Sequence, residues 1–254
     1  MNLKKDELIN NDDFYDIFLE GLKKNPSLKK KFGMALCKHD LFYKSYHSFI
    51  FPGLFERLTA SIRTLPNFMI LGFAKCGTTS LFHYLTQHKN LTGSTHKEPH
   101  YFSYKYGSGI DWYKALYPIR KKGLTFEASQ TYLWDPNSHK RIKKDLPDCK
   151  FIVILRNPIE QCYSYYQHMK NGGLEKSSFE DCIKQDKQRL LHIMQHTKKQ
   201  HYNYFKMPVS LPYVSFAKYD LWLKPFLDSF KNDRFLFLAS FGSIILVLPL
   251  FSTI

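Results

Sequence analysis

Residues 68–81 read FMILGFAKCGTTSL and carry the most informative pattern in the chain. Four apolar residues precede Gly72 and Gly77, whose G-x-x-x-x-G spacing is that of a loop that binds nucleotide phosphates between a strand and a helix. Ordinary ATP and GTP loops have a lysine directly after the second glycine, but here Thr78 stands at that position and Lys75 lies inside the loop. The spacing alone is a weak signal, because a plain strand-to-helix turn also produces it.

Short apolar runs alternate with helical patterns on both sides of this loop. Such alternation is typical of a parallel sheet covered by helices on both faces. We therefore predict an α/β fold, a P-loop-like three-layer sandwich with a central, mainly parallel sheet flanked by helices. A chain of 254 residues that is 44% hydrophobic can bury one substantial core. The predicted strands are 68–71, 124–127, 150–155 and 234–239, and the predicted helices are 78–87, 138–145, 158–169, 179–197 and 215–230.

The composition divides the chain into three regions. Residues 1–60 hold helical patches with lysine clusters and form a predicted N-terminal extension, residues 61–240 form the α/β domain, and residues 241–254 form an apolar tail. Residues 235–254 contain no charged side chain and are long enough to be a candidate membrane span. A buried strand that begins after Arg234 explains the first part of this stretch as well, and what remains is short for a span.

Charge and cysteine usage limit the classes of ligand and compartment. The formal net charge of +15 favours an anionic ligand, such as a nucleotide, a nucleic acid, a sulfated or phosphorylated substrate, or a membrane surface. The five cysteines are scattered and form no C-x-x-C pair, which indicates neither a disulfide framework nor a zinc site. The N-terminus lacks the apolar core of a secretory signal. We expect a cytoplasmic protein, with membrane association through the apolar tail as the alternative.

A second motif, FIVILRNPIEQCYSYY, covers residues 151–166. A buried strand ends in Arg156, Pro158 begins a helix, and Ser164 lies eight residues after the arginine, about two helical turns into that helix. The guanidinium of Arg156 offers planar donors for a phosphate, and we expect it at the same sheet edge as Lys75. An arginine that ends a strand for solubility is the alternative reading of this residue.

Together these motifs resemble the superfamily of sulfotransferases that use 3′-phosphoadenosine 5′-phosphosulfate (PAPS). Two further stretches, HKEPHYFS at 96–103 and FEASQTYLWDP at 126–136, are similar to heparan and chondroitin type carbohydrate sulfotransferases. The resemblance runs from about residue 66 to 239, and four motifs in the same order make it far more specific than any one of them.

The resemblance implies a role for each matching residue. Lys75 would contact the 5′-phosphate and the leaving oxygen, while Arg156 and Ser164 would hold the 3′-phosphate. Glu98 matches the general base that takes the proton of the acceptor, and Lys97 and His100 beside it are candidate substrate contacts. The remaining predicted cofactor contacts are Cys76, Gly77, Thr78, Thr79 and Ser80. Sulfuryl transfer puts charge on the leaving phosphate, which a lysine and helix amides stabilise, so we expect no metal.

Two positions depart from the family pattern. Glu127 is followed by Ala128, where several glycan-type members have a lysine, and one substrate or leaving-group contact is in question. The uncharged residues 241–254 stand where the family has a basic, glycine-containing loop over the nucleotide, so we also consider a truncated or frameshifted chain whose activity is lost or depends on a partner.

The predicted function is transfer of a sulfuryl group from PAPS to a hydroxyl or amine of a carbohydrate, by in-line attack with Glu98 as base. Three alternatives stay open: a catalytically impaired sulfotransferase-fold binding protein, a P-loop kinase, and a basic module that binds nucleic acid or anionic membranes. We expect a glycan partner rather than nucleic acid. The sequence predicts neither the identity of the acceptor nor the oligomeric state.

Overall fold

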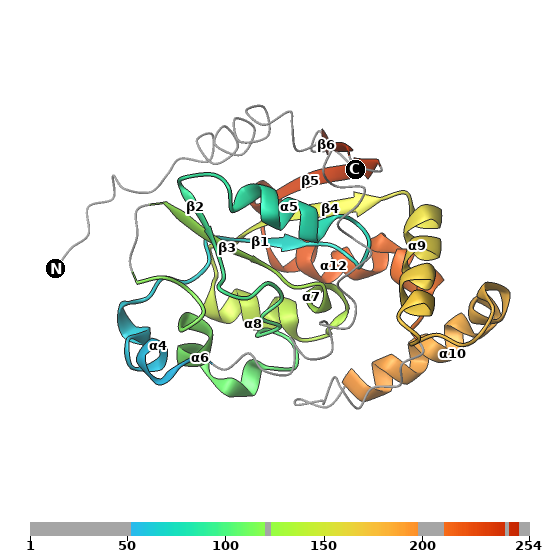
Figure 1. Ribbon diagram of the computed structural model, residues 1–254, viewed down its shortest axis with the longest axis horizontal. Helices are drawn as coiled ribbons and strands as arrows, with labels where there is room; N and C mark the ends of the chain where they lie inside the picture. Colours follow the sequence, from blue (N-terminus) through green and yellow to red (C-terminus); the bar gives the residue numbers. More distant parts are fainter. Residues whose placement is uncertain (1–51, 120–122, 198–210, 242–243, 249–254) are drawn as a thin grey trace.

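A computed structural model describes residues 52–119, 123–197, 211–241 and 244–248. It contains a six-stranded sheet with the strand order β2-β3-β1-β4-β5-β6 (Figure 1). The first five strands in this order run parallel, and β6 pairs antiparallel with β5. The strands are β1 (Phe68–Leu71), β2 (Leu91–Gly93), β3 (Leu124–Ala128), β4 (Lys150–Arg156), β5 (Phe235–Phe241) and β6 (Ile244–Leu248).

Helices connect the strands and cover the sheet. The α-helices are α4 (Leu54–Leu58), α5 (Thr78–Leu85), α6 (Ile110–Lys114), α7 (Thr131–Trp134), α8 (Ser138–Asp145), α9 (Pro158–Asn171), α10 (Phe179–Thr197), α11 (Tyr213–Ala217) and α12 (Tyr219–Ser229). Short 3-10 helices are η2 (Ala60–Ile62), η3 (Tyr106–Ser108) and η5 (Asn232–Arg234).

Aromatic contacts show that helices lie on both faces of the sheet. Residues paired across parallel strands point to the same face, and Phe68 stacks on its partner Phe126 with ring centroids 5.0 Å apart. Phe82 of α5 packs on this face, 5.1 Å from Phe126. Phe151 pairs with the residue after Phe68 and so points to the opposite face, where Phe226 of α12 lies 5.7 Å away. Helix α8 lies beside α12 (Figure 1). The predicted three-layer fold is confirmed.

The central strands explain why their sequences are apolar without alternation. All four residues of β1 are buried. In β4 the residues from Phe151 to Ile154 are buried, and Leu155 is partly buried. A parallel strand between two layers of helices is buried on both faces, and each fully buried Phe, Ile or Leu contributes about 1.5–3 kcal/mol through the hydrophobic effect.

Most predicted elements match the structure to within two residues. The strand at 68–71 and the helices at 138–145 and 179–197 have the predicted bounds. The single helix predicted at 215–230 is wrong, because α11 and α12 are separated at Lys218. The carbonyl of Ser215 accepts both the N–H of Lys218 and the indole N–H of Trp222, at 3.3 Å and 2.8 Å, which closes the chain into a turn there. The sequence also gave no expectation of β2, α6, α7 or β6.

The two predicted terminal regions lie only partly within the described residues. Of the N-terminal extension, 52–60 are described and contain α4. In the apolar tail, 244–248 form β6, which extends the sheet from β5. Among the described helices, none combines the length and the apolar character that crossing a bilayer requires.

Candidate active site

The segments that carry most of the predicted site residues follow the adjacent strands β3, β1 and β4 or lie beside their carboxyl ends, at one edge of the sheet. Strand β1 leads into the phosphate loop, 72–77, strand β4 ends in Arg156, and β3 ends beside Glu98, whose N–H donates to the carbonyl of Ala128 at 3.0 Å. Ligands of open α/β sheets bind at this edge, because loops from neighbouring strands diverge there. Figure 1 shows these ends together in the middle of the molecule.

The phosphate loop needs both of its glycines. A Cβ atom on Gly72 would lie 2.7 Å from Ile154 Cγ2 and 2.8 Å from Thr78 Cγ2, so no side chain fits. Gly77 has a φ of 102°, a left-handed conformation that glycine adopts without steric cost. Lys75 has a φ of 71°, which is unfavourable for a residue with a Cβ and is a kind of strain found at functional sites. The loop therefore holds the backbone of Lys75 in a specific conformation.

Helix α5 begins directly after the loop and presents its N-terminus to the site. Its N-cap residue, Gly77, has no side chain to accept hydrogen bonds from the first turn. The first-turn N–H groups of a helix have no acceptor within the helix and, with the helix dipole, attract an anion. Thr78 is buried, Ser80 is half-buried and Thr79 is exposed. These three predicted residues thus lie at the helix end that favours phosphate.

Cys76 anchors the loop to the core. Its N–H donates to the carbonyl of Phe73 at 3.1 Å, and its Sγ lies 3.6 Å from the hydroxyl of Tyr219 in α12. Burial raises the pKa of the Cys76 thiol to about 11, so the thiol stays protonated at neutral pH. The side chain supports the loop from inside, and a contact between Cys76 and the cofactor stays a prediction. The sequence carried no signal for Tyr219.

Arg156 joins the two nucleotide motifs. Its Nη1 donates to the carbonyl of Lys75 at 3.2 Å, although the two residues are 81 positions apart. Its Nε and Nη2 both reach Oε2 of Glu160, at 3.3 Å and 3.1 Å, and the guanidinium side chain is 23% exposed. The predicted proximity of Lys75 and Arg156 is therefore confirmed.

The R-N-P sequence forms the start of α9. Asn157 accepts the N–H groups of Ile159 and Glu160 at 3.0 Å and 3.3 Å, and Pro158 occupies the first turn, where its missing N–H costs nothing. Ser164 lies in the second turn and is half-buried. The cap fixes the direction in which the helix leaves the strand and Arg156.

Gln161 is a site residue that the motifs did not identify. It is fully buried on α9, and its Nε2 donates to the carbonyl of Ala74 in the phosphate loop at 2.8 Å. Tyr165, one turn later, is also buried. A glutamine on the apolar stripe of a helix is the signal that could have indicated it, since buried polar side chains require hydrogen-bond partners.

The carboxylate of Glu98 lies between the two neighbours that the sequence predicted. Lys97 Nζ contacts Glu98 Oε1, and His100 Nε2 lies 3.4 Å from Glu98 Oε2. Glu98 and His100 have positive φ values of 61° and 55°, in a segment, 97–103, that we call the Glu98 turn. A left-handed backbone is unfavourable for residues with a Cβ atom, so two such residues in one short turn require hydrogen bonds or packing from the surrounding structure to hold them.

A second carboxylate, that of Glu127, lies near this turn. We call Glu127 and the three residues that donate hydrogen bonds to it the Glu127 cluster. Glu127 is fully buried in β3 and accepts hydrogen bonds from the hydroxyls of Tyr113, Tyr132 and Ser129. Burial raises its pKa to about 7 against the opposing effect of these hydroxyls, and the charge of Glu98 adds to the rise. The sequence pointed to Glu127 only through its neighbour Ala128.

Basic side chains surround the Glu98 turn. Burial lowers the pKa of Lys105 to about 8, and its Nζ lies 5.2 Å from the ring of Trp112. Burial lowers the pKa of His83 and of His96, with added effects from Lys97 and Lys105 respectively. Lys97 Nζ contacts Glu98 Oε1, and the backbone N–H of Lys105 donates to the carbonyl of His100 at 3.3 Å, so both lysines adjoin the turn. A positive charge beside the carboxylate favours an anionic molecule.

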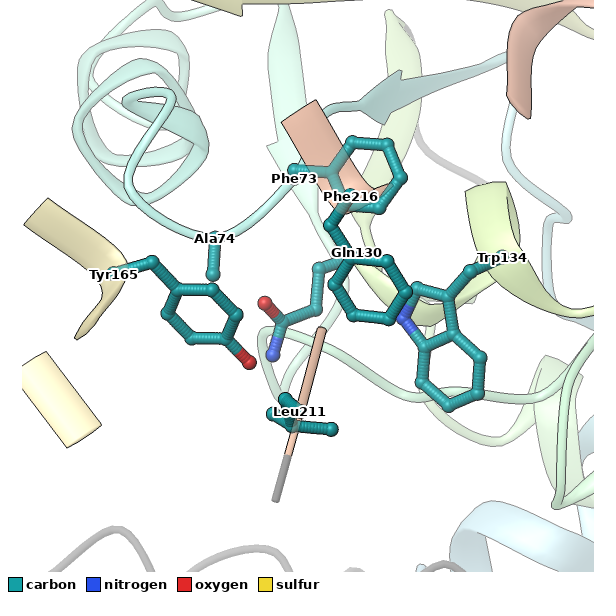
Figure 2. Close-up of a pocket in the computed structure, with 7 residues that line it drawn as sticks. All are labelled: Phe73, Ala74, Gln130, Trp134, Tyr165, Leu211 and Phe216. Carbon is teal, nitrogen blue, oxygen red and sulfur yellow. The ribbon is translucent and has the colours of Figure 1, made fainter. Parts of the chain in front are cut away.

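A small crevice opens beside the phosphate loop (Figure 2). Its aromatic walls come from segments after β1 and β3 and from α9 and α11. The hydroxyl of Tyr165 and the amide of Gln130 point toward the same space (Figure 2). The lining residues are Phe73, Ala74, Gln130, Trp134, Tyr165, Leu211 and Phe216.

Metal ligands are not grouped in the described part of the chain: no three His, Cys, Asp or Glu side chains there are placed to hold one ion.

Comparison with known proteins agrees with this geometry. Residues 65–239 match the family described as the sulfotransferase domain. The chain belongs to the sulfotransferase family. It is 36% identical over 106 residues to the membrane-associated sulfotransferase kil1 of Dictyostelium discoideum, a match that covers 40% of this chain and 22% of that protein.

Other sulfotransferase relatives include a human enzyme and a solved structure. The chain is 37% identical over 118 residues to the human bifunctional heparan sulfate N-deacetylase/N-sulfotransferase 2, which covers 43% of this chain and 13% of that protein. The chain thus spans a quarter or less of the length of these two curated relatives. The crystal structure of a sulfotransferase from Alicyclobacillus acidocaldarius superposes with a TM-score of 0.54 at 28% identity, over 69% of this chain and 73% of that one.

Proposed function

We propose that this sulfotransferase-family chain transfers a sulfuryl group from PAPS to a hydroxyl or amine of a carbohydrate. The observation that carries the proposal is the bond from Arg156 to the carbonyl of Lys75, which brings the two predicted phosphate-binding motifs together. Glu98 lies at the end of the neighbouring strand, as a base for the acceptor requires.

Lys75 and the first turn of α5 hold the 5′ side of the nucleotide in this proposal. As the bond between sulfur and the 5′-phosphate oxygen breaks, negative charge develops on that oxygen, and an ammonium with helix amides stabilises it. The backbone of Lys75 is left-handed and its carbonyl accepts a hydrogen bond from Arg156, so the point from which the side chain starts is fixed before the reaction begins. Thr78, Thr79 and Ser80 supply further donors at the same helix end.

Arg156 and Ser164 hold the 3′-phosphate. The guanidinium binds Glu160, whose side chain is 56% exposed, and a phosphate offers the same acceptor geometry with more charge. The phosphate would replace Glu160 while Nη1 keeps its bond to Lys75. Binding of the nucleotide therefore exchanges one partner of Arg156 without moving the loop.

Glu98 acts as the base. The acceptor atom attacks sulfur from the side opposite the leaving oxygen, its proton passes to the Glu98 carboxylate, and 3′-phosphoadenosine 5′-phosphate departs. Lys97 and His100 lie beside the two carboxylate oxygens and hold the carboxylate in place.

The acceptor is a glycan in this proposal. The human relative is named for heparan sulfate, an anionic polysaccharide, and both the formal net charge of +15 and the contact of Lys97 with Glu98 favour such a molecule. A P-loop kinase is disfavoured by Thr78, which stands where such an enzyme has its lysine.

The test combines binding and transfer. Calorimetry should detect binding of 3′-phosphoadenosine 5′-phosphate to the parent chain. The affinity should be at least about tenfold lower in Lys75→Ala and in Arg156→Ala, because each substitution removes a charged contact worth about 1.5–3 kcal/mol. The exposed Lys89→Ala and Arg57→Ala serve as matched controls. Radiolabelled PAPS with panels of glycans, phenols and amines then identifies the acceptor class.

Each outcome of this test has a distinct meaning. Unchanged affinity in both site variants excludes the nucleotide site. Normal nucleotide binding without transfer to any acceptor supports the impaired binding protein instead. Magnesium-dependent ATP hydrolysis would support the kinase.

A further inference from the structure

The Glu127 cluster is connected to the Glu98 turn by a directed chain of hydrogen bonds. The hydroxyl of Ser129 donates to Glu127 Oε2 at 2.7 Å and accepts the backbone N–H of His100 at 3.1 Å. The imidazole of His100 then lies beside the proposed base, with its Nε2 at an ion-pair distance of 3.4 Å from Glu98 Oε2. The buried carboxylate is therefore two side chains away from the proposed base.

Thr131 provides a second link between the same segments. Its Oγ1 lies 2.9 Å from His100 Nδ1 and 2.7 Å from the hydroxyl of Ser103. Glu127, Ser129 and Thr131 thus alternate along the end of β3 and the start of α7, and two of them contact His100 directly. Together with the bond from Glu98 N–H to Ala128, these contacts hold the left-handed backbone of the turn.

We propose that Glu127 is a positioning residue for Glu98, which it orients through Ser129 and His100. This inference depends on the proposed function, in which Glu98 is the base. Glu127 lies in strand β3. The hydrogen bonds given above connect it to Tyr113, Ser129 and Tyr132 and not to the phosphate loop or Arg156. Its effect should therefore appear in turnover and not in nucleotide binding.

The directions of the hydrogen bonds describe the ionised form of Glu127, which predominates above its pKa of about 7. Because the Ser129 hydroxyl donates its hydrogen bond to Glu127, the lone pairs of the serine oxygen face the N–H of His100. The hydroxyls of Tyr113 and Tyr132 also donate to Glu127, so all three neighbours require an acceptor. An amide at this position would present one N–H₂ group, which would turn a hydroxyl away and break the order of the chain.

The experiment compares two variants in the same cluster. Ser129→Ala removes the link to His100, whereas Tyr132→Phe removes a hydrogen bond from the same carboxylate and leaves the link in place. We expect kcat to fall about 10–100-fold in Ser129→Ala and in Glu127→Gln, and less than about threefold in Tyr132→Phe. The affinity for 3′-phosphoadenosine 5′-phosphate should change less than about twofold in all three.

A second readout does not depend on activity. The ring ¹⁵N resonances of His100 should shift in Ser129→Ala and stay unchanged in Tyr132→Phe, because only the first variant releases the histidine backbone. Equal losses of kcat in Ser129→Ala and Tyr132→Phe, or an unchanged His100 spectrum in Ser129→Ala, would overturn the positioning role. If the parent chain binds the nucleotide and transfers no sulfuryl group, the proposed function fails, and the His100 spectrum still decides whether the link exists.

Discussion

The phosphate half of the site, residues 72–80 with Arg156, offers backbone groups and the partly or fully exposed side chains of Lys75, Thr79 and Arg156. The carboxylate half, the Glu98 turn with the Glu127 cluster, consists mainly of buried side chains. In the proposed function the first half exchanges partners with the nucleotide, because Arg156 is paired with an exposed glutamate that a phosphate can replace. The second is fixed before any ligand arrives, because its groups satisfy one another. Binding and turnover should therefore be separable by mutation.

The largest expected effect is on turnover in Glu98→Gln. The amide keeps the shape of the side chain but accepts no proton, and loss of a general base lowers kcat by about 10²–10⁴-fold. The affinity for 3′-phosphoadenosine 5′-phosphate should stay within about threefold, because the phosphate half is intact. Single-turnover transfer and calorimetry measure the two effects, and a variant that retains full turnover would assign the base to another residue.

A pH titration of stability compares Glu127 with a second buried carboxylate, Glu175. Glu127 has a folded pKa near 7, above its ordinary 4.5, so the folded state binds the proton more tightly and stability falls as pH rises from about 4.5 to 7. Glu175 is bound by Arg189 at 2.6 Å and by Tyr213. Hydrogen bonds and charge from Arg189 outweigh the effect of burial and lower its pKa to about 2, so its contribution is lost as pH falls from about 4.5 to 2.

Urea unfolding across this pH range tests the difference. In Glu127→Gln the decline in unfolding free energy between about pH 4.5 and 7 should be smaller than in the parent, by up to about 3 kcal/mol, since one pKa unit corresponds to about 1.4 kcal/mol. In Glu175→Gln that part of the curve should be unchanged and the loss below pH 4.5 reduced. Parallel curves for the parent and Glu127→Gln would show that the carboxyl group is not strained by burial.

The two halves also differ in how far the sequence predicted them. The phosphate half is local: its glycines, its lysine and the helix start lie within ten residues, and the spacing alone suggested phosphate. Arg156 was predicted at the same edge because parallel strands end together. Such short-range patterns follow directly from backbone geometry.

In the carboxylate half the sequence assigned roles only to residues of the first carbohydrate-type motif, 96–103, and none to Glu127, although the second motif, 126–136, covers it. Glu98, Lys97 and His100 were named, and the structure brings them together. The donors of Glu127 come from α6, from α7 and from the loop between β3 and α7, and no sequence period relates a buried tyrosine hydroxyl to a glutamate in a strand. Likewise, the three-residue strand β2 is too short to show a pattern, and the split between α11 and α12 depends on the tertiary contact of Trp222.

A smaller effect is expected for Arg156→Lys, which keeps the charge and removes the planar fork. The lysine reaches either the carbonyl of Lys75 or a phosphate but does not bind both, so nucleotide affinity should fall about tenfold while kcat at saturation changes little. Arg57→Lys, on the exposed helix α4, is the matched control. Affinity equal to that of the parent would mean that only the charge of Arg156 matters.

The smallest effect, and the only gain, is expected for Glu160→Gln. Glu160 binds Nε and Nη2 of Arg156 in the absence of ligand, and a phosphate must displace it. The pair is exposed and solvent-screened, so its removal should raise nucleotide affinity only about two- to fivefold, corresponding to less than about 1 kcal/mol. Asp181→Gln, at an exposed carboxylate on α10, controls for the change in net charge. Weaker binding in Glu160→Gln would mean that the glutamate orients the guanidinium for the phosphate and does not compete with it.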